Sequence, residues 1–303
     1  MFLSGLFGKF LKEKQFLANI SPKTVRSYQQ AFNAYQRVLS KSAVYFDREG
    51  TEALPTKDTL KDFVIGMRES GLSPGACNVY IRSINSFLSW LHTERHISEP
   101  LKIKQLPQAK QVIPIFSEKH IQALIKFRPQ SQYERRLYAL VCLLIDTGAR
   151  IDEGLTALVS GVDLDNLVIK VRGKGNKERL LPISIELRKI LWVYLSKHRF
   201  KVPSDYLFPT RDGVKLEYHN TLRDIKELCS KLGIEGVRLS PHGFRHFFSV
   251  TFMRRGGDIY RLSRLLGHTS VKTTEIYLQS MGVEMVQQLH QQLSPLSSNH
   301  TMR

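Results

Sequence analysis

The stretch that decides the fold reads S-P-H-G-F-R-H-F-F-S-V at residues 240–250 and G-G-D-I-Y-R-L-S-R-L-L-G-H-T-S-V-K-T-T-E-I-Y at residues 256–277. Ser240 and Pro241 predict a helix start, because serine suits the N-cap and proline the first helical position. This start places His242 and Arg245 on one face of the first turns. A helix N-terminus that carries an arginine and a histidine is a natural site for a phosphate.

Two further short helices are expected in the same stretch. The first ends at Gly267, and His268 follows it directly. Ser270 predicts the N-cap of the next helix, which carries Tyr277. The pattern therefore gathers two imidazoles, a guanidinium group and a phenol in one small helical region.

The H-x-x-R, L-G-H and terminal tyrosine pattern resembles the tyrosine recombinases, which include the phage integrases and the Xer chromosome-dimer resolvases. Two upstream segments extend the resemblance and lie in the family's order. The segment 147–153 looks like the one that bears the family's first arginine, here Arg150. The segment 172–179 looks like the β-hairpin that bears the family's lysine, here Lys174. The resemblance is strong over residues 117–280 and looser over residues 1–95.

These residue types suit metal-free cleavage of a DNA strand. The phenol of Tyr277 can attack phosphorus and form a phosphotyrosine, which keeps the energy of the broken bond for rejoining. Arg150 and Arg245 suit bidentate contact with the non-bridging phosphate oxygens. His268 would add a third hydrogen bond to the same phosphate. No phosphate-binding loop or dinucleotide fingerprint appears in the sequence, so nucleotide hydrolysis is not indicated.

The resemblance implies three further roles. Lys174 fits the general acid for the 5′ hydroxyl leaving group, although Lys177 in the same turn is an alternative. His242 resembles the position assigned to proton transfer with the tyrosine. Glu153 would orient the Arg150 segment from behind, or else be an ordinary surface helix residue. His242 and His246 could also chelate a metal, but no third ligand completes a zinc pattern, so we expect no metal and no cofactor.

Composition favours a polyanionic partner. The chain has 303 residues with 45 Lys and Arg against 27 Asp and Glu, which gives a formal charge of +18. Nucleic acid is the simplest partner for such a surplus, and a merely solubilising surface is the alternative. Cys77, Cys142 and Cys229 are predicted to be buried thiols in a reducing cytosol. The apolar start of the chain has neither the charge order of a signal peptide nor the length of a membrane span.

The predicted fold is mainly helical with a small antiparallel sheet. Residues 1–96 form an all-helical module, which the resemblance implies is a DNA-gripping core-binding domain. Residues 97–116 read as a basic, extended linker, either running along phosphates or simply solvated. Residues 117–280 form the mixed catalytic domain, with a β-hairpin around the Gly-Lys-Gly-Asn-Lys turn. Residues 281–303 hold a short helix and tail, which docks on a neighbouring protomer or on its own body.

In the first module, the aromatic side chains recur at helical spacing and are predicted to be core rather than base-stacking platforms. The polar faces beside them are the better DNA candidates, including the asparagines Asn78 and Asn85. The residues predicted to contact DNA are Lys23, Arg26, Arg37 and Arg82.

The sequence thus predicts a two-domain DNA clamp that acts as a site-specific recombinase, either resolvase or integrase. It would act through a 3′-phosphotyrosine intermediate and a Holliday junction, as a tetramer on two specific double-stranded DNA sites. The expected location is the bacterial cytoplasm at the nucleoid, without membrane association. One alternative is a type IB topoisomerase that nicks and reseals without pairing two sites. A second is an architectural DNA-binding protein whose catalytic site has decayed.

Overall fold

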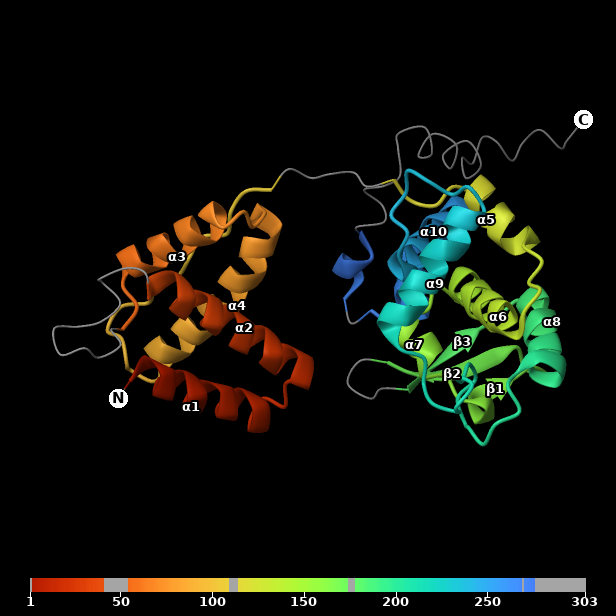
Figure 1. Ribbon diagram of the computed structural model, residues 1–303, viewed down its shortest axis with the longest axis horizontal. Coiled ribbons are helices and arrows are strands. Elements are labelled where there is room, and N and C mark those ends of the chain that lie inside the picture. The colour runs from red at the N-terminus through yellow and green to blue at the C-terminus, as the bar shows by residue number, and fades with distance from the viewer. Residues whose placement is uncertain (1, 41–53, 109–113, 174–177, 269, 276–303) are drawn as a thin grey trace, which may run out of the picture. The chain divides into compact units, whose positions relative to one another are not determined.

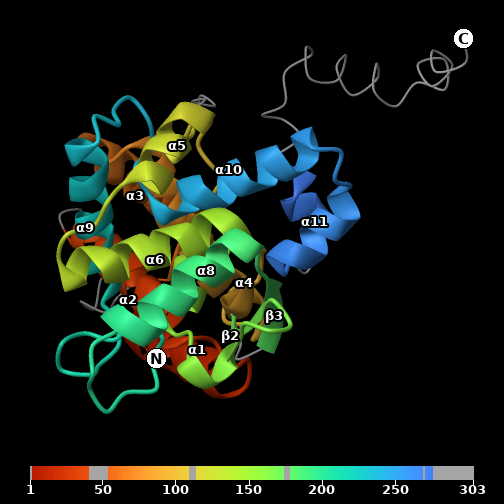
Figure 2. The ribbon, with the colours of Figure 1, turned by 90° about the vertical axis from the view of Figure 1, so that its right-hand side faces the viewer.

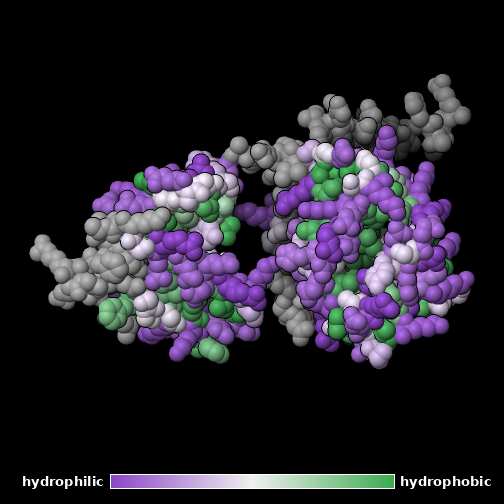
Figure 3. Space-filling model, in the orientation of Figure 1, coloured by the Kyte–Doolittle hydropathy of each residue, from purple (hydrophilic) through white to green (hydrophobic). Residues whose placement is uncertain are grey.

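The computed structural model describes residues 2–40, 54–108, 114–173, 178–268 and 270–275. The chain divides into two compact units, Met1–Gln111 and Val112–Arg303, which are described separately below (Figure 1). Within the described ranges, no helix is both long enough and apolar enough to cross a membrane. Hydrophilic side chains cover most of the visible face of each unit (Figure 3).

The first unit is helical throughout its regular elements, which are α1 (Leu3–Phe16), α2 (Pro22–Leu39), α3 (Lys57–Glu69) and α4 (Pro74–Thr93). The starts of α2, α3 and α4 follow the sequence signals. Ser21, Thr56 and Ser73 accept the amide hydrogen bonds of the residues three positions later. Proline follows Ser21 and Ser73 at the first helical position, where its missing N–H costs nothing.

Aromatic side chains build the core of this unit, as the helical spacing predicts. The Phe7 and Phe32 rings stack with centroids 3.9 Å apart, and Phe87 meets both of them edge-on. Phe10 and Phe63 are also fully buried. These rings are therefore occupied in packing α1 to α4 together. Cys77 is a buried free thiol here, as are Cys142 and Cys229 in the second unit, which confirms that the three cysteines are buried thiols.

The first part of the predicted linker is fixed onto α4 rather than running as a solvated tether. The Asn85 side chain donates to the Ile103 carbonyl at 2.9 Å and accepts from the Ile103 amide at 2.8 Å. Asn78 makes the same pair of bonds with Leu106, at 2.9 and 2.8 Å. Two asparagines that the sequence offers as DNA contacts are thus engaged in bracing the chain, because an extended segment without strand partners needs other groups for its amides.

The second unit holds α5 (Glu118–Lys126), α6 (Gln132–Thr147) and α7 (Ile151–Leu155), then a three-stranded sheet, then the remaining helices. The strands β1 (Val162–Asp163), β2 (Val168–Arg172) and β3 (Glu178–Pro182) are antiparallel, in the order β1-β2-β3. Val168 pairs with Pro182 and Arg172 with Glu178, which confirms the predicted hairpin. The later helices are α8 (Ile185–Val193), continued by a π-helical turn (Tyr194–His198), and α9 (Tyr218–Lys231), α10 (Pro241–Arg254) and α11 (Ile259–Leu266).

Helix α6 is central in this unit. Leu140, Leu143 and Leu144 are fully buried, and α5, α8, α9 and α10 all pack against the helix. Figure 2 shows α6 and α10 side by side. This contact brings the end of α6, where Arg150 follows, next to the first turns of α10, which carry Arg245. A mainly helical fold with a small antiparallel sheet is therefore confirmed.

The start of α10 differs from the expected cap. Ser240 occupies the N-cap position, but its hydroxyl oxygen accepts no amide hydrogen bond and is buried without a partner among the residues that the structure describes. The Gly243 amide donates instead to the backbone carbonyl of Ser240 at 2.8 Å. Pro241 at the first helical position still sets the start of the helix, so the placement of His242 and Arg245 is retained.

We expect Asn85→Ala to release the segment that follows α4. The substitution leaves the amide and carbonyl of Ile103 without partners, at a cost of about 1–3 kcal/mol for each desolvated group. Hydrogen exchange of residues 97–108, measured by mass spectrometry on the full chain, should accelerate markedly. Asn33→Ala is the matched control, because Asn33 is exposed on α2. Unchanged protection in Asn85→Ala would contradict the bracing role.

Candidate functional site

The candidate site is built around the carboxyl end of α11. Asp258 caps the start of this helix by accepting the Tyr260 and Arg261 amides, each at 2.9 Å. Gly267 ends it in the left-handed conformation with φ of 63°, and the His268 amide closes the turn on the Ser263 carbonyl at 3.0 Å. The last carbonyl groups of a helix have no partner within the helix and carry the negative end of its dipole. Cationic side chains can therefore gather at this end.

Arg245 reaches this end from the second turn of α10. Its Nη2 donates to the Leu266 carbonyl at 2.7 Å, and its Nη1 donates to the Gly148 carbonyl at 2.9 Å. The residue is only 2% exposed. One guanidinium group thus ties together the ends of α6 and α11.

Arg150 approaches the same carbonyls from the turn between α6 and α7. Its Nη1 donates to the Leu266 carbonyl and its Nη2 to the Gly267 carbonyl, both at 3.3 Å. Gly148 makes the turn possible, since its φ is 60° and a Cβ there would lie 2.5 Å from the Phe248 ring. About a third of the Arg150 side chain, 34%, remains exposed.

Glu153 is a buried partner of the Arg150 segment and not a surface residue. It is 1% exposed, and its Oε2 accepts the Arg150 amide at 2.7 Å while its Oε1 accepts Arg150 Nη1 at 3.2 Å. Burial alone raises the pKa of this carboxyl, but hydrogen bonds and charge from Arg179, together with Arg150, outweigh burial and lower the pKa. The carboxylate is therefore ionised at neutral pH.

Arg179 is a member of the site that the sequence reasoning missed. Its Nε and Nη2 donate to the two oxygens of Glu153 at 3.0 and 2.8 Å, and its Nη1 donates to the Leu265 carbonyl. The signal was the alternation along β3. Arg179 shares a face with Leu181, which is buried, whereas Leu180 between them is 60% exposed. A charged residue on the inward face of a strand needs a buried partner.

His268 lies beside these guanidinium groups as a neutral ring. Arg245 Nη2 lies 2.7 Å from His268 Nε2, and Thr274 Oγ1 lies 2.8 Å from His268 Nδ1. Because arginine can only donate, Nε2 is the acceptor and the ring proton is on Nδ1. Partial burial, followed by the charges of Arg245, Arg150 and Arg179, lowers the pKa of His268 to about 4. Thr274 is a second residue that the sequence did not single out.

His242 is exposed at the first turn of α10, one helical turn before His246. Desolvation and the charges of Arg245, Arg238 and Arg150 lower the pKa of His242.

Among the described residues, no group of three or more His, Cys, Asp or Glu side chains is placed to hold a metal ion. Among the described residues named above, the guanidinium groups of Arg150, Arg179 and Arg245 outnumber the Glu153 carboxylate, and this net positive charge suits an anion.

Three predicted residues lie outside the described residues: Tyr277, Lys174 and Lys177. The described chain leads toward them. Ser270 begins a 3-10 turn, Val271–Thr273, and accepts the Lys272 amide at 3.3 Å, and Tyr277 comes seven residues after Ser270 in the sequence. Strands β2 and β3 flank the segment that holds both lysines.

The four predicted DNA contacts of the first unit are all exposed, and they make no ion pair with another described residue. They are Lys23, Arg26, Arg37 and Arg82.

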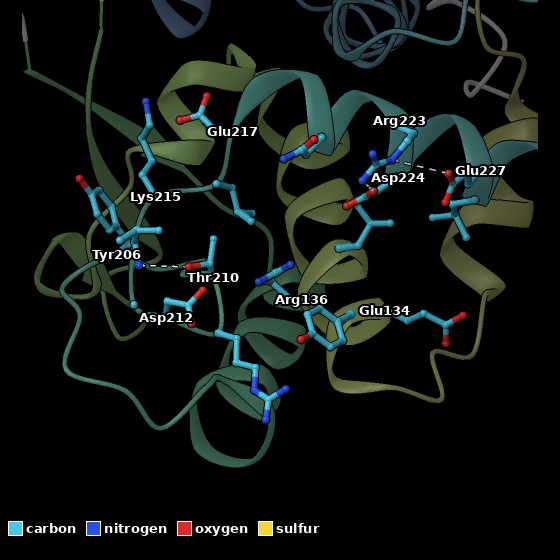
Figure 4. Close-up of a pocket in the computed structure, with 18 of the residues that line it drawn as sticks. Glu134, Arg136, Tyr206, Thr210, Asp212, Lys215, Glu217, Arg223, Asp224 and Glu227 are labelled. Carbon is cyan, nitrogen blue, oxygen red and sulfur yellow. Dashed lines mark hydrogen bonds and ion pairs between the residues drawn. The ribbon is translucent and has the colours of Figure 1, made fainter.

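A large cavity of about 1020 Å³ lies elsewhere in the second unit, between the start of α6, the loop before α9, and α9 itself. None of the predicted site residues lines it. Arg136 is in the middle of the side chains that Figure 4 labels, and its Nη1 donates to the Pro209 carbonyl at 2.6 Å. Acidic and basic side chains alternate around the rest of the wall, so the cavity lacks the net positive charge of the α11 centre.

Comparisons with known proteins show which family and which fold the chain resembles. Residues 114–282 match the model of the phage integrase family. The chain is 30% identical to tyrosine recombinase XerC of Bacillus subtilis over 280 residues, which is 88% of this chain and 89% of the relative. It is 27% identical to tyrosine recombinase XerD of Vibrio cholerae over 298 residues, 96% of each chain. The integrase of transposon Tn1549, solved in complex with circular intermediate DNA, has the same fold, with a TM-score of 0.75 at 18% identity, covering 97% of this chain and all of the other.

We expect the His268 ring of the DNA-free protein to titrate near pH 4, measured by NMR of histidine-labelled protein with His268→Gln for assignment. The unfolded chain, with a histidine pKa of about 6.5, then binds more protons between these two values. The stability contributed by His268 is therefore complete above pH 6.5 and is lost as the pH falls toward 4. A midpoint at or above 6.5 would contradict the neutral ring.

Proposed function

Because the chain belongs to the phage integrase family of tyrosine recombinases, we propose that the α11 centre binds the DNA phosphate that Tyr277 attacks. The protein is an enzyme of site-specific DNA recombination, which breaks and rejoins DNA strands. The observation that carries the assignment of the site is the meeting of Arg150, Arg245 and His268 at the end of one helix. Tyr277 follows the same helix by a short connection in the sequence.

The proposed reaction begins with the phenol oxygen of Tyr277. It forms a bond to phosphorus while the bond from phosphorus to the 5′ oxygen breaks, which leaves a 3′-phosphotyrosine. A free phenol has a pKa of about 10, so the cationic surroundings must favour its ionised form. The transition state carries more negative charge than the phosphodiester. Arg150 and Arg245 neutralise that charge through the N–H groups of planar, permanently charged side chains.

His268 would join them as a hydrogen-bond donor once the phosphate arrives. In the DNA-free protein its Nε2 accepts from Arg245, so it cannot donate from that atom. A phosphate anion nearby raises the pKa of the ring from about 4 and opposes the effect of the arginines. Thr274 Oγ1 can go on accepting from Nδ1–H, which fixes the ring plane while Nε2 gains a proton.

The leaving 5′ oxygen needs a proton, and the β2–β3 turn is the proposed source. Lys174 is assigned as the general acid because glycines flank it in the sequence, with Lys177 as the alternative donor. His242 is assigned to proton transfer with the tyrosine, and its exposure at the start of α10 leaves it accessible to substrate. Its lowered pKa keeps the ring neutral and able to accept a proton.

The partner is double-stranded DNA that carries a specific recombination site. We assign Lys23, Arg26, Arg37 and Arg82 to the DNA contacts of the first unit, since they are exposed charges without ion pairs. Exchange between two sites through a Holliday junction calls for four protomers, with residues 281–303 docking in cis or in trans. Because its substrate is DNA, we assign the protein to the bacterial cytoplasm, in association with the nucleoid. A relaxing topoisomerase is not favoured, because the relatives are named recombinases.

We expect wild-type protein to form an SDS-resistant adduct with a nicked suicide duplex, and Tyr277→Phe to form none. The phenylalanine ring keeps the shape of the side chain but lacks the attacking oxygen. Tyr260→Phe is the matched control, because Tyr260 is 69% exposed on α11 and should leave the adduct unchanged. EDTA in every reaction should have no effect on yield. An equal adduct from Tyr277→Phe would move the nucleophile to another residue.

We expect Lys174→Ala to cleave an ordinary duplex about 10²- to 10⁴-fold more slowly than the wild-type protein. This is the rate factor that general acid catalysis typically supplies. A 5′-thio leaving group needs no proton, so cleavage of the thio substrate should return close to the wild-type rate. Lys177→Ala run in parallel should show neither the loss nor the rescue. Rescue of Lys177→Ala instead would transfer the acid role to Lys177.

A further inference from the structure

Arg179 connects three elements of the second unit. It lies on β3, holds the Glu153 carboxylate of α7 with two hydrogen bonds of 3.0 and 2.8 Å, and donates to the Leu265 carbonyl of α11. Only 15% of its side chain is exposed, and Glu153 is more deeply buried still. Gly267 leaves room for it, because a Cβ at Gly267 would lie 2.9 Å from Arg179 Cδ. The side chain is thus a fixed part of the packing.

We propose that Arg179 is a positioning residue for strand cleavage, which neutralises Glu153 so that Arg150 keeps its positive charge for the DNA phosphate. The inference rests on the proposed function and deepens it. Arg179 itself need not touch the DNA. Its action passes through Glu153 to Arg150, and through Leu265 to the end of α11, where Arg245 and His268 also lie.

The electrostatic reason lies in how Glu153 is shared. Without Arg179, the Glu153 carboxylate would pair with Arg150 alone, whose Nη1 lies 3.2 Å away. A buried carboxylate that close offsets most of the charge that the guanidinium group can offer to an incoming anion. With Arg179 bound to both oxygens of Glu153, the carboxylate holds the backbone and side chain of Arg150 in place without neutralising it. Arg179 then holds Glu153, which orients Arg150, and Arg150 supplies the positive charge to the phosphate.

The geometric reason lies in the position of Arg179 on the hairpin. It lies two residues after Lys177, near the start of β3, and it hydrogen-bonds to the Leu265 carbonyl at the end of α11. This contact fixes the start of β3 next to the proposed phosphate site. A displacement of about 1 Å in a catalytic group can cost on the order of a hundredfold in rate. Loss of Arg179 should therefore slow chemistry much more than it weakens DNA binding.

The test compares Arg179→Met and Arg179→Lys with Arg188→Met in the adduct assay under single turnover. Arg188 is an exposed arginine of α8 paired with Asp165, so its variant removes the same charge away from the centre. We expect Arg179→Met to form adduct about a hundredfold more slowly, with Arg179→Lys between it and wild type. The Kd for DNA should change by less than about threefold, and Arg188→Met should match wild type in both measurements.

A duplex with a methylphosphonate at the cleavage position separates positioning from folding. This substrate lacks the negative charge that Arg150 meets, so the loss in Arg179→Met should shrink to about tenfold or less. Glu153→Gln should also slow cleavage, and the double variant should be no slower than Arg179→Met alone, because residues that act as a unit are not additive. Equal losses on both substrates, or a fully additive double variant, would overturn the inference in favour of a structural role.

Two other outcomes are distinguishable. A wild-type rate in Arg179→Met overturns the inference and leaves the proposed function in place. No adduct from the wild-type protein overturns both together. If Arg179→Met does not fold, as shown by circular dichroism, Arg179→Lys carries the same comparison, since it keeps the charge but only one of the two bonds to Glu153. Equal relative losses of Arg179→Lys on the two substrates would then overturn the inference.

Discussion

The hydrogen bonds between three guanidinium groups and the last carbonyls of α11 are the interaction on which the second unit depends. Arg150, Arg179 and Arg245 come from three different elements and meet the carbonyls of Leu265, Leu266 and Gly267. A helix end of this kind is negative and lacks internal partners. It can therefore hold several cations together that would otherwise repel one another. The carbonyls organise the arginines before any phosphate is present.

The charges of the centre follow from that arrangement. The Glu153 carboxylate is hydrogen-bonded to two of these guanidinium groups, and it is buried and ionised between Arg150 and Arg179. His268 stays neutral, because its neighbours are positive and its ring is partly desolvated. The net positive charge that remains is available to a phosphate and to the extra charge of its transition state. Rigid donors that are fixed in advance cost no reorganisation during the reaction.

The first unit is held together by an aromatic core and by side-chain hydrogen bonds to the backbone. Its aromatic core packs four helices tightly, and Asn78 and Asn85 extend that packing to the chain that follows α4. Side chains that bind backbone amides and carbonyls on both edges replace the missing strand partners of an extended segment. The exposed arginines and lysine of α2 and α4 take no part in this packing, and they are therefore available to DNA phosphates.

The sequence by itself determined the local structure and the chemistry. Serine and proline marked the start of α10, helical spacing identified the aromatic core, and the Gly-Lys-Gly-Asn-Lys segment identified the hairpin. The resemblance of short motifs identified the family, because the residues that react with a phosphate recur at fixed local spacings. Lys174 and Tyr277 remain assignments from the sequence alone, since both lie outside the described residues.

Only the tertiary structure decided which side chains meet across long separations. Arg179 and Glu153 are 26 positions apart, and Arg150 and Gly267 are 117 apart. No periodicity links such pairs, because their contact depends on how β3, α7 and α11 pack against one another. The same reason explains Asn78 and Asn85, whose polar spacing resembles a solvent face but whose partners are 28 and 18 residues away. Sequence patterns report the environment along one element, whereas partners on other elements are chosen by packing.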